Sequence, residues 1–378
     1  MNGMRPERSC RSRSSELVRP HARPAGAGER AGAGGPADED GRCSRRQALR
    51  RLAWGAAGLT IMARSGAAAA LPGSAGAGSG AAGALPGSAG AGAGAAGGAA
   101  GSSAAGAAAA GVRLAVIRHG APDELTRRAL AALGGMSRFV SAGNRVVIKP
   151  NIGWDRVPEQ AANTHPEVVA ALVRMALEAG AKRVTVMDHT CNDARRCYAR
   201  SGIEAAARAA GADVVHLPDG RGTEMDIGGE TLRAWPVHRE VIETDVLINA
   251  PIAKHHSLTQ ASLGMKNWLG AVDGRRNQLH QRIDAASVDL AAFFKPALTV
   301  LDATRILLRN GPQGGNLDDV AEPRIVAAGT DPVAVDLFGA GLFDLAPEDF
   351  PLLALAEARG LGRPAESPPD LIDLDLEG

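Results

Sequence analysis

The sequence predicts an α/β fold in which helices cover both faces of a mostly parallel sheet, arranged as one domain or as two lobes. From Val112 onward, short runs rich in β-branched residues alternate with stretches whose apolar residues recur about every 3.6 positions. That alternation is typical of βαβ units. Residues 1–111 have a composition that cannot build a core, so the folded body is predicted to be residues 112–378.

Seven runs are predicted to be strands, with helices between most of them. In chain order the strands are Val112–Ile117, Arg145–Lys149, Arg183–Met187, Asp213–His216, Asp245–Asn249, Ala297–Leu301 and Arg324–Ala328. The clearest helix spans Pro166–Ala179 and has an apolar face of period 3.6. Thr164 and Glu167 fit a capping box at its start, and Gly180 is placed to end it.

Residues 1–70 are predicted to be a leader for export by the twin-arginine machinery. Ser44–Arg50 resembles the twin-arginine motif, and the apolar segment Leu52–Ala63 follows it. Because that segment is much shorter than the about 20 residues of a membrane span, we expect no stable membrane anchor. The three alanines that end at Ala70 fit a signal-peptidase site. The mature protein is therefore expected in the periplasm, outside the cell or in the cell envelope.

Residues 71–111 are predicted to be a flexible tether. They are almost wholly Ala, Gly and Ser, and the stretch Leu71–Gly78 recurs as Leu85–Gly92. Glycine loses much backbone entropy on folding, and such small side chains bury too little surface to offset that loss. We expect no chemistry in this segment.

Charge and cysteine content argue against two classes of function. The chain has 42 basic and 41 acidic residues, so it has no summed field to hold a polyanion, and nucleic acid is not an expected partner. Its four cysteines form no C-x-x-C pair, which disfavours an iron-sulfur cluster. Cys191 and Cys197 would lie too far apart for a disulfide on a helix but could pair in a loop.

Polar residues follow four of the predicted strands. Because the carboxyl ends of parallel strands open on one edge of a sheet, these side chains are expected to converge on a single cleft. Each of them could instead cap a helix or form a turn, although Lys149 has no capping role. The residues are Lys149, Asn151, Asp188, His189, Asn249 and Asp302. A divalent cation held by Asp188, Asp302 and Asp331 is an alternative use of the carboxylates.

The segment Asn249–Gly270 has the highest density of candidate catalytic residues. It contains Lys254, the adjacent His255 and His256, and Lys266. Neighbouring residues of an extended chain point to opposite sides, so one of the two histidines should face the cleft, and we favour His255. A helix starting near Gln260 or Ser262 would place Ser262 and Lys266 on one face, with its N-terminus favouring an anion. Carboxylate or phosphate binding is the physical interpretation.

Several of these motifs resemble those of the domain of unknown function 362 family. In the segment just described the matching residues are Asn249, Pro251, Lys254, His255, Ser262, Leu263, Lys266, Asn267 and Gly270. Val147–Asn151, Thr164–Glu167, Gly311–Gly315 and Gly329–Asp336 also resemble the family's recurring motifs. The resemblance covers roughly residues 112–362 and implies an α/β fold, but it names no reaction. The same segment is distantly similar to the lactate racemase family, at the level of fold.

Three functions are compatible with these residues. In the first, an exported enzyme binds a small anionic substrate with Lys149, Lys254 and Lys266, with Asn267 in the same site, while His255 or His189 moves a proton. In the second, the protein captures a small anion or a metal cofactor without catalysis. In the third, it is an envelope protein whose tether sets its reach, which does not account for the charged groups at the strand ends.

Overall fold

The computed structural model of the protein describes residues 111–365 and 370–378. The leader predicted for residues 1–70 lies outside the described residues, as does the predicted tether up to residue 110. Among the residues that are described, no helix is long and apolar enough to cross a membrane.

The described residues form one large sheet of eleven strands and a separate two-stranded ribbon. The strands of the large sheet are β1 (Leu114–Arg118), β2 (Arg145–Pro150), β3 (Arg183–Asp188), β4 (Asp213–His216), β7 (Val246–Ala250), β8 (Ile252–His256), β9 (Gln260–Ser262), β10 (Leu298–Leu307), β11 (Val320–Ala321), β12 (Ile325–Gly329) and β13 (Leu371–Asp375). The ribbon consists of β5 (Thr223–Asp226) and β6 (Ala234–Val237). The main path of the sheet is continuous, so within the described residues the alternative of two lobes is not supported.

The sheet is mostly parallel, as predicted. Its main path runs in the order β13-β1-β12-β10-β7-β2-β3-β4, and β2 is parallel to both of its neighbours, β3 and β7. The antiparallel exceptions involve β12, β11 and the short β9. All seven predicted strands are present within two residues at their starts. The prediction of the Ala297–Leu301 strand ended too early, because β10 continues to Leu307.

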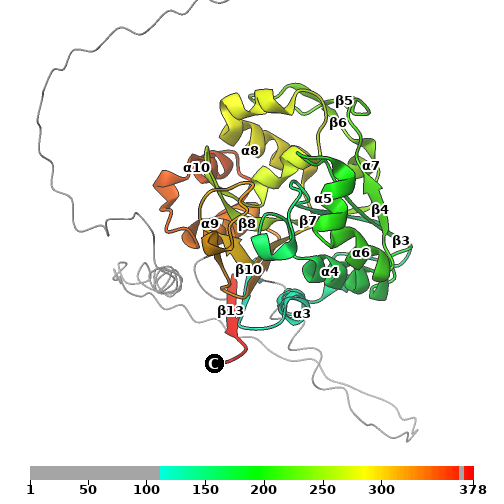
Figure 1. Ribbon diagram of the computed structural model, residues 1–378, viewed down its shortest axis with the longest axis vertical. Coiled ribbons are helices and arrows are strands. Elements are labelled where there is room, and N and C mark those ends of the chain that lie inside the picture. The colour runs from blue at the N-terminus through cyan, green and yellow to red at the C-terminus, as the bar shows by residue number, and fades with distance from the viewer. Residues whose placement is uncertain (1–110, 366–369) are drawn as a thin grey trace, which may run out of the picture. The chain divides into compact units, whose positions relative to one another are not determined.

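Helices pack on both faces of the sheet (Figure 1). The two faces have separate hydrophobic cores. The helices are α3 (Pro122–Ala132), α4 (Pro166–Glu178), α5 (Ala194–Arg200), α6 (Ile203–Ala209), α7 (Arg239–Ile242), α8 (Ile283–Phe294), α9 (Pro332–Gly341) and α10 (Pro351–Ala358). Successive residues of β2 alternate between the cores: Val147 belongs to the core that contains α8, α9 and α10, whereas Val146 and Ile148 belong to the core that contains α3 and α4. This alternation follows from the two-residue repeat of a strand.

The predicted helix Pro166–Ala179 is confirmed as α4, but its start is capped differently. His165 is the N-cap residue, and its Nδ1 accepts a hydrogen bond from the Glu167 N–H at 3.1 Å. Thr164 instead donates to the Ala250 carbonyl at 2.7 Å, which ties the entry of α4 to the end of β7. Gly180 ends the helix as predicted, with a φ of 93° that glycine adopts without strain.

Candidate functional site

A pocket of about 720 Å³ opens where β2 and β3 end at the carboxyl edge of the sheet. The 3₁₀ helix η4 (Met265–Gly270) and the strand β8 complete its walls. Eight of the eleven predicted site residues line it: Lys149, Asn151, Asp188, His189, Lys254, Ser262, Lys266 and Asn267. The parallel strands therefore bring together residues that lie more than 100 positions apart in the chain.

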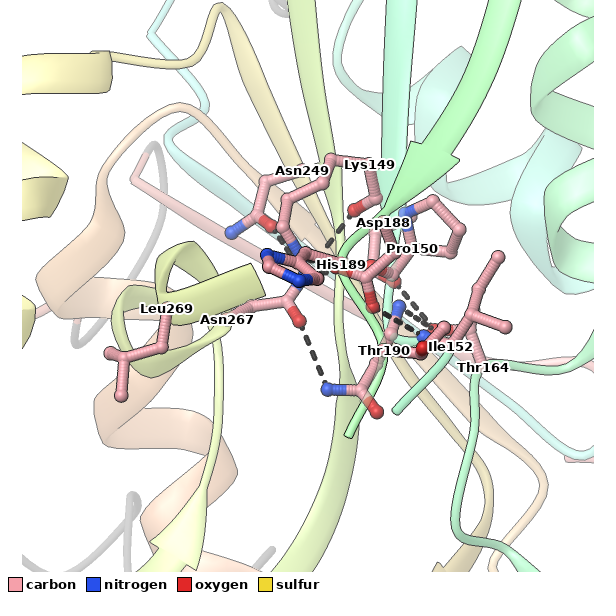
Figure 2. A network of polar contacts seen from close by, with 12 residues as sticks. Lys149, Pro150, Ile152, Thr164, Asp188, His189, Thr190, Asn249, Asn267 and Leu269 are labelled. Atoms are coloured by element: carbon pink, nitrogen blue, oxygen red, sulfur yellow. Dashed lines mark hydrogen bonds and ion pairs between the residues drawn. The ribbon is translucent and has the colours of Figure 1, made fainter. Parts of the chain in front are cut away.

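Lys149 and Asp188 form a buried ion pair at the base of the pocket (Figure 2). Lys149 Nζ lies 2.6 Å from Asp188 Oδ1, and the other carboxylate oxygen accepts a hydrogen bond from Ile152 N–H at 2.6 Å. Burial lowers the pKa of Lys149, and the Asp188 carboxylate opposes that shift. A side-chain methyl at Gly270 would overlap the Asp188 carboxylate, so any larger residue there would have to displace the ion pair. The charge of Lys149 is thus already neutralised within the protein.

Three asparagines connect the walls of the pocket, and Figure 2 shows Asn249 and Asn267 beside Lys149. Asn267 Nδ2 donates to Asn249 Oδ1 at 2.9 Å and to the Lys149 carbonyl at 3.2 Å. Its Oδ1 accepts from Asn151 Nδ2 at 3.1 Å. Asn249 is buried and does not line the pocket. Its Nδ2 donates to the carbonyl of Gly264, the residue before η4, and so helps to hold that wall in place.

Two lysines in the pocket lack an acidic partner. Lys254 is 2 % exposed, and its Nζ donates to Asn151 Oδ1 at 3.0 Å and to the Ala162 carbonyl at 2.5 Å. Burial lowers its pKa to about 7, and the nearby charge of Lys266 adds to the effect. Burial likewise lowers the pKa of Lys266 to about 8. Within the described residues, no hydrogen bond or ion pair reaches Lys266 Nζ.

His256, and not the predicted His255, lines the pocket. Lys254 and His256 lie two positions apart on β8 and so share a face of the strand, while His255 points to the opposite face. His255 accepts a hydrogen bond from Gly311 N–H at 3.1 Å. His256 Nδ1 accepts from the N–H groups of Leu258 and Thr259, and burial lowers its pKa to about 3. The imidazole of His256 is therefore neutral, with its proton on Nε2.

The helix predicted to start near Gln260 or Ser262 is absent from the described chain. Residues 260–262 form β9, which pairs with β8 and brings Ser262 opposite Lys254. The 3₁₀ helix η4 follows, and Asp336 anchors its start by accepting hydrogen bonds from the N–H groups of Gly264 and Met265. Ser262 and Lys266 still reach the same pocket, but the geometry provides no α-helical N-terminus for an anion.

The cation site predicted from three aspartates does not form. Asp188 pairs with Lys149, Asp302 pairs with Arg305 at 2.8 Å, and Asp331 caps α9 and pairs with Arg113. Asp302 is fully buried and lies outside the pocket, so its predicted binding role is not supported either. It organises the backbone instead, by accepting a hydrogen bond from His165 N–H at 2.7 Å.

Residues 274–280 form a pocket wall that was not predicted from the sequence. Arg276 donates to the carbonyl oxygens of His189 and Thr190, at 2.9 and 2.7 Å, and so closes the pocket beside β3. His280 stacks at 6.5 Å from His256. The sequence of residues 274–280 has no apolar repeat typical of a strand or a helix. Their place in the pocket wall is therefore visible only in the folded structure. Three of the chain's five lysines also line this one pocket.

Comparisons with known proteins find relatives of this chain. Residues 146–341 match the family described as Domain of unknown function (DUF362). The Thylakoid-associated protein sll1697 of Synechocystis sp. is 30% identical over 244 residues, which cover 62% of this chain and 74% of that protein.

Two solved structures are more distant. The lactate racemase apoprotein from Thermoanaerobacterium thermosaccharolyticum is 11% identical, with a TM-score of 0.36 over 61% of this chain. A structural genomics target from Thermotoga maritima is 14% identical, with a TM-score of 0.33 over 62% of this chain. The matches span 56% and 59% of those two proteins, which is less than two thirds of their length.

Proposed function

The chain belongs to the domain of unknown function (DUF362) family, and from that premise we propose that it is an exported enzyme that binds a small anion beside Lys266 and moves a proton on it. Lys254 is the proposed proton carrier, and His256 takes the place that His255 held in the sequence-based prediction. The family assigns no reaction, so the argument rests on the pocket itself.

The observation that carries the proposal is the unpaired ammonium group of Lys266. Lys266 is partly buried, and a charge removed from water is normally compensated by a partner. Within the described residues no ion pair or hydrogen bond reaches its Nζ, and the Asp284 carboxylate only partly opposes the lowering of its pKa. Since its pKa is about 8, most of the lysine is charged at pH 7. Arg276 adds a second positive charge bonded only to carbonyl oxygens, and the Lys149 charge is neutralised by Asp188. An anionic carboxylate or phosphate group is the complement of this arrangement.

Lys254 supplies the proposed proton chemistry. A pKa of about 7 leaves the amine close to half protonated at neutral pH, which is the range in which a general acid or base works best. The neutral His256, with its proton on Nε2, is available as a hydrogen-bond donor to the bound anion. The alternative is an exported protein that captures the same anion without turnover. It would use the same lysines for binding.

Export through the twin-arginine machinery is part of the proposal. It is supported by the order of the basic motif, the apolar segment and the small residues between Ser44 and Ala70. The relative from Synechocystis is named as thylakoid-associated. Replacing Arg45 and Arg46 by lysine should stop export of the full chain, measured by cell fractionation, and unchanged export would contradict the assignment.

The binding experiment compares Lys266→Met with Lys182→Met, a control at an exposed lysine away from the pocket. Small molecules released from the purified full chain are identified by mass spectrometry, and oxalate and inorganic phosphate are titrated by calorimetry. We expect Lys266→Met to weaken anion binding by about 10- to 100-fold, since it removes one charged hydrogen bond, and the control to change nothing. Equal affinity in both variants would refute the proposed anion site. Turnover lost in Lys254→Met, with binding retained, would exclude the alternative of capture alone.

A further inference from the structure

A second cluster of chemically reactive groups lies where the pocket wall meets β6. One ring nitrogen each of His189 and His238 and one carboxylate oxygen of Asp273 all lie within 4.8 Å of one another. All three residues are buried, and His238 is fully so. His189 Nδ1 lies 3.2 Å from His238 Nε2 and 2.9 Å from the Val272 carbonyl oxygen. Only His189 of the three lines the pocket.

The backbone places these groups rigidly. Val237, at the end of β6, forms a β-bridge with Val272, which sets His238 beside Asp273. His189 N–H donates to the Gly270 carbonyl at 2.9 Å, which fixes the chain after β3 against η4. The carboxylate of Asp273 accepts hydrogen bonds from the N–H groups of Gly220, Gly222 and Gly274. A carboxylate has about four acceptor positions, so one remains open.

With one proton on each histidine, the cluster contains more hydrogen-bond acceptors than donors. His189 Nε2 lies 2.8 Å from Asp219 Oδ1, and a carboxylate can only accept, so a single proton on His189 lies on Nε2. Nδ1 then presents a bare lone pair, yet it faces the Val272 carbonyl oxygen, which is also an acceptor. If His238 Nε2–H donates to it, the buried Nδ1 of His238 is left bare, and within the described residues that atom has no hydrogen-bond partner. A cation held between His189 Nδ1 and His238 Nε2 would use the two ring nitrogens that face each other, with the proton of His238 on Nδ1.

We propose that His189, His238 and Asp273 hold a transition-metal ion, with Zn²⁺ as the best match, at the wall of the pocket. Two imidazoles and a carboxylate are a common zinc donor set. Bonds of about 2.0 Å in a tetrahedron separate neighbouring ligand atoms by roughly 3.3 Å, close to the observed 3.2 Å between the two imidazole nitrogens. The contact from His189 Nε2 to Asp219 is the carboxylate-histidine pairing that orients metal-bound histidines.

The metal site goes beyond the proposed anion site and does not depend on it. His189 belongs both to the pocket lining and to the proposed metal site. A metal ion held there would therefore place a Lewis acid beside the pocket. Metal binding is measured without turnover or anion. Failure of one hypothesis therefore leaves the other intact.

The test uses the full chain without an added histidine tag, stripped with a chelator and titrated with Zn²⁺ in competition with a chromogenic indicator. The variants are His238→Gln and Asp273→Asn, and His280→Gln is the control, because His280 lines the same pocket outside the cluster. Thermal unfolding of each metal-free variant checks that it is folded. If His238→Gln fails to fold, His189→Gln at the pocket edge replaces it.

We expect the wild-type chain to bind Zn²⁺, both cluster variants to lose affinity by at least about 100-fold, and the control to stay within about twofold. Co²⁺ in place of Zn²⁺ should give a visible absorption band that the cluster variants lack. The leader carries Cys10 and Cys43, which can also bind zinc, so loss in the variants decides the assignment. A folded wild-type chain without Zn²⁺ affinity, or unchanged binding in folded cluster variants, would overturn the proposal.

Discussion

Removing one partner of the Lys149–Asp188 ion pair should strongly destabilise the fold. Lys149 is fully buried and Asp188 is 2 % exposed, so neither charge can turn to water when its partner is lost. Breaking a buried pair in this way costs about 3–5 kcal/mol of the free energy of unfolding. At about 2–4 °C per kcal/mol for a domain of this size, Lys149→Met should lower Tm by roughly 6–20 °C.

The assay is urea unfolding of the full chain at pH 7, followed by circular dichroism, for Lys149→Met, Asp188→Asn and the double variant. Asn at position 188 keeps an oxygen for the Ile152 N–H, so the loss reports on the charge. The double variant buries no unpaired ion and should lose less than the sum of the single variants, with a coupling of about 1–3 kcal/mol. Additive losses, or a loss below about 1 kcal/mol for Lys149→Met, would refute this reasoning.

Three further predictions concern the pocket walls. Gly270→Ala should destabilise the fold by about 1–3 kcal/mol in the same assay, because its methyl would overlap the Asp188 carboxylate, and an unchanged midpoint would show that the wall yields freely. His256→Gln should weaken oxalate binding by about tenfold, whereas His255→Gln should leave it unchanged in calorimetry, and the reverse order would restore the original assignment. Affinity for oxalate should fall as the pH rises through about 8, the pKa of Lys266, because the bound ammonium is lost, and a flat profile from pH 7 to 10 would contradict its role.

The strand and helix pattern was largely predictable from the sequence. The β-branched runs that became β2, β3 and β7 are buried on both faces, so their composition alone identified them. The convergence of Lys149 and Asp188 followed from the rule that parallel strands end at one edge. The rule does not predict that the two side chains form an ion pair. The ion pair depends on β2 and β3 being neighbours in the sheet.

The sequence also contains enough information to choose correctly between His255 and His256. Lys254 and His256 have the spacing of residues on one face of a strand, so a prediction that places Lys254 in the pocket excludes His255. The start of β9 after a short turn was not predictable in the same way. Gln260 adopts a φ of 57°, a conformation that its side chain does not favour, and the tertiary structure imposes it. The proposed metal site likewise depends on contacts between distant segments, among them the β-bridge of Val237 with Val272.

Lysine titration by NMR tests the central claim most directly, namely that Lys254 and Lys266 lie together in a positively charged pocket that lowers the pKa of both. The chain has only five lysines, so ¹³C labelling of their side chains gives few signals, and Lys254→Met and Lys266→Met assign two of them. We predict that these two signals titrate near pH 7 and pH 8 in the folded protein. Titration of both near the ordinary lysine value of 10.5 would contradict the account, because lysines in contact with bulk water have no reason to shift.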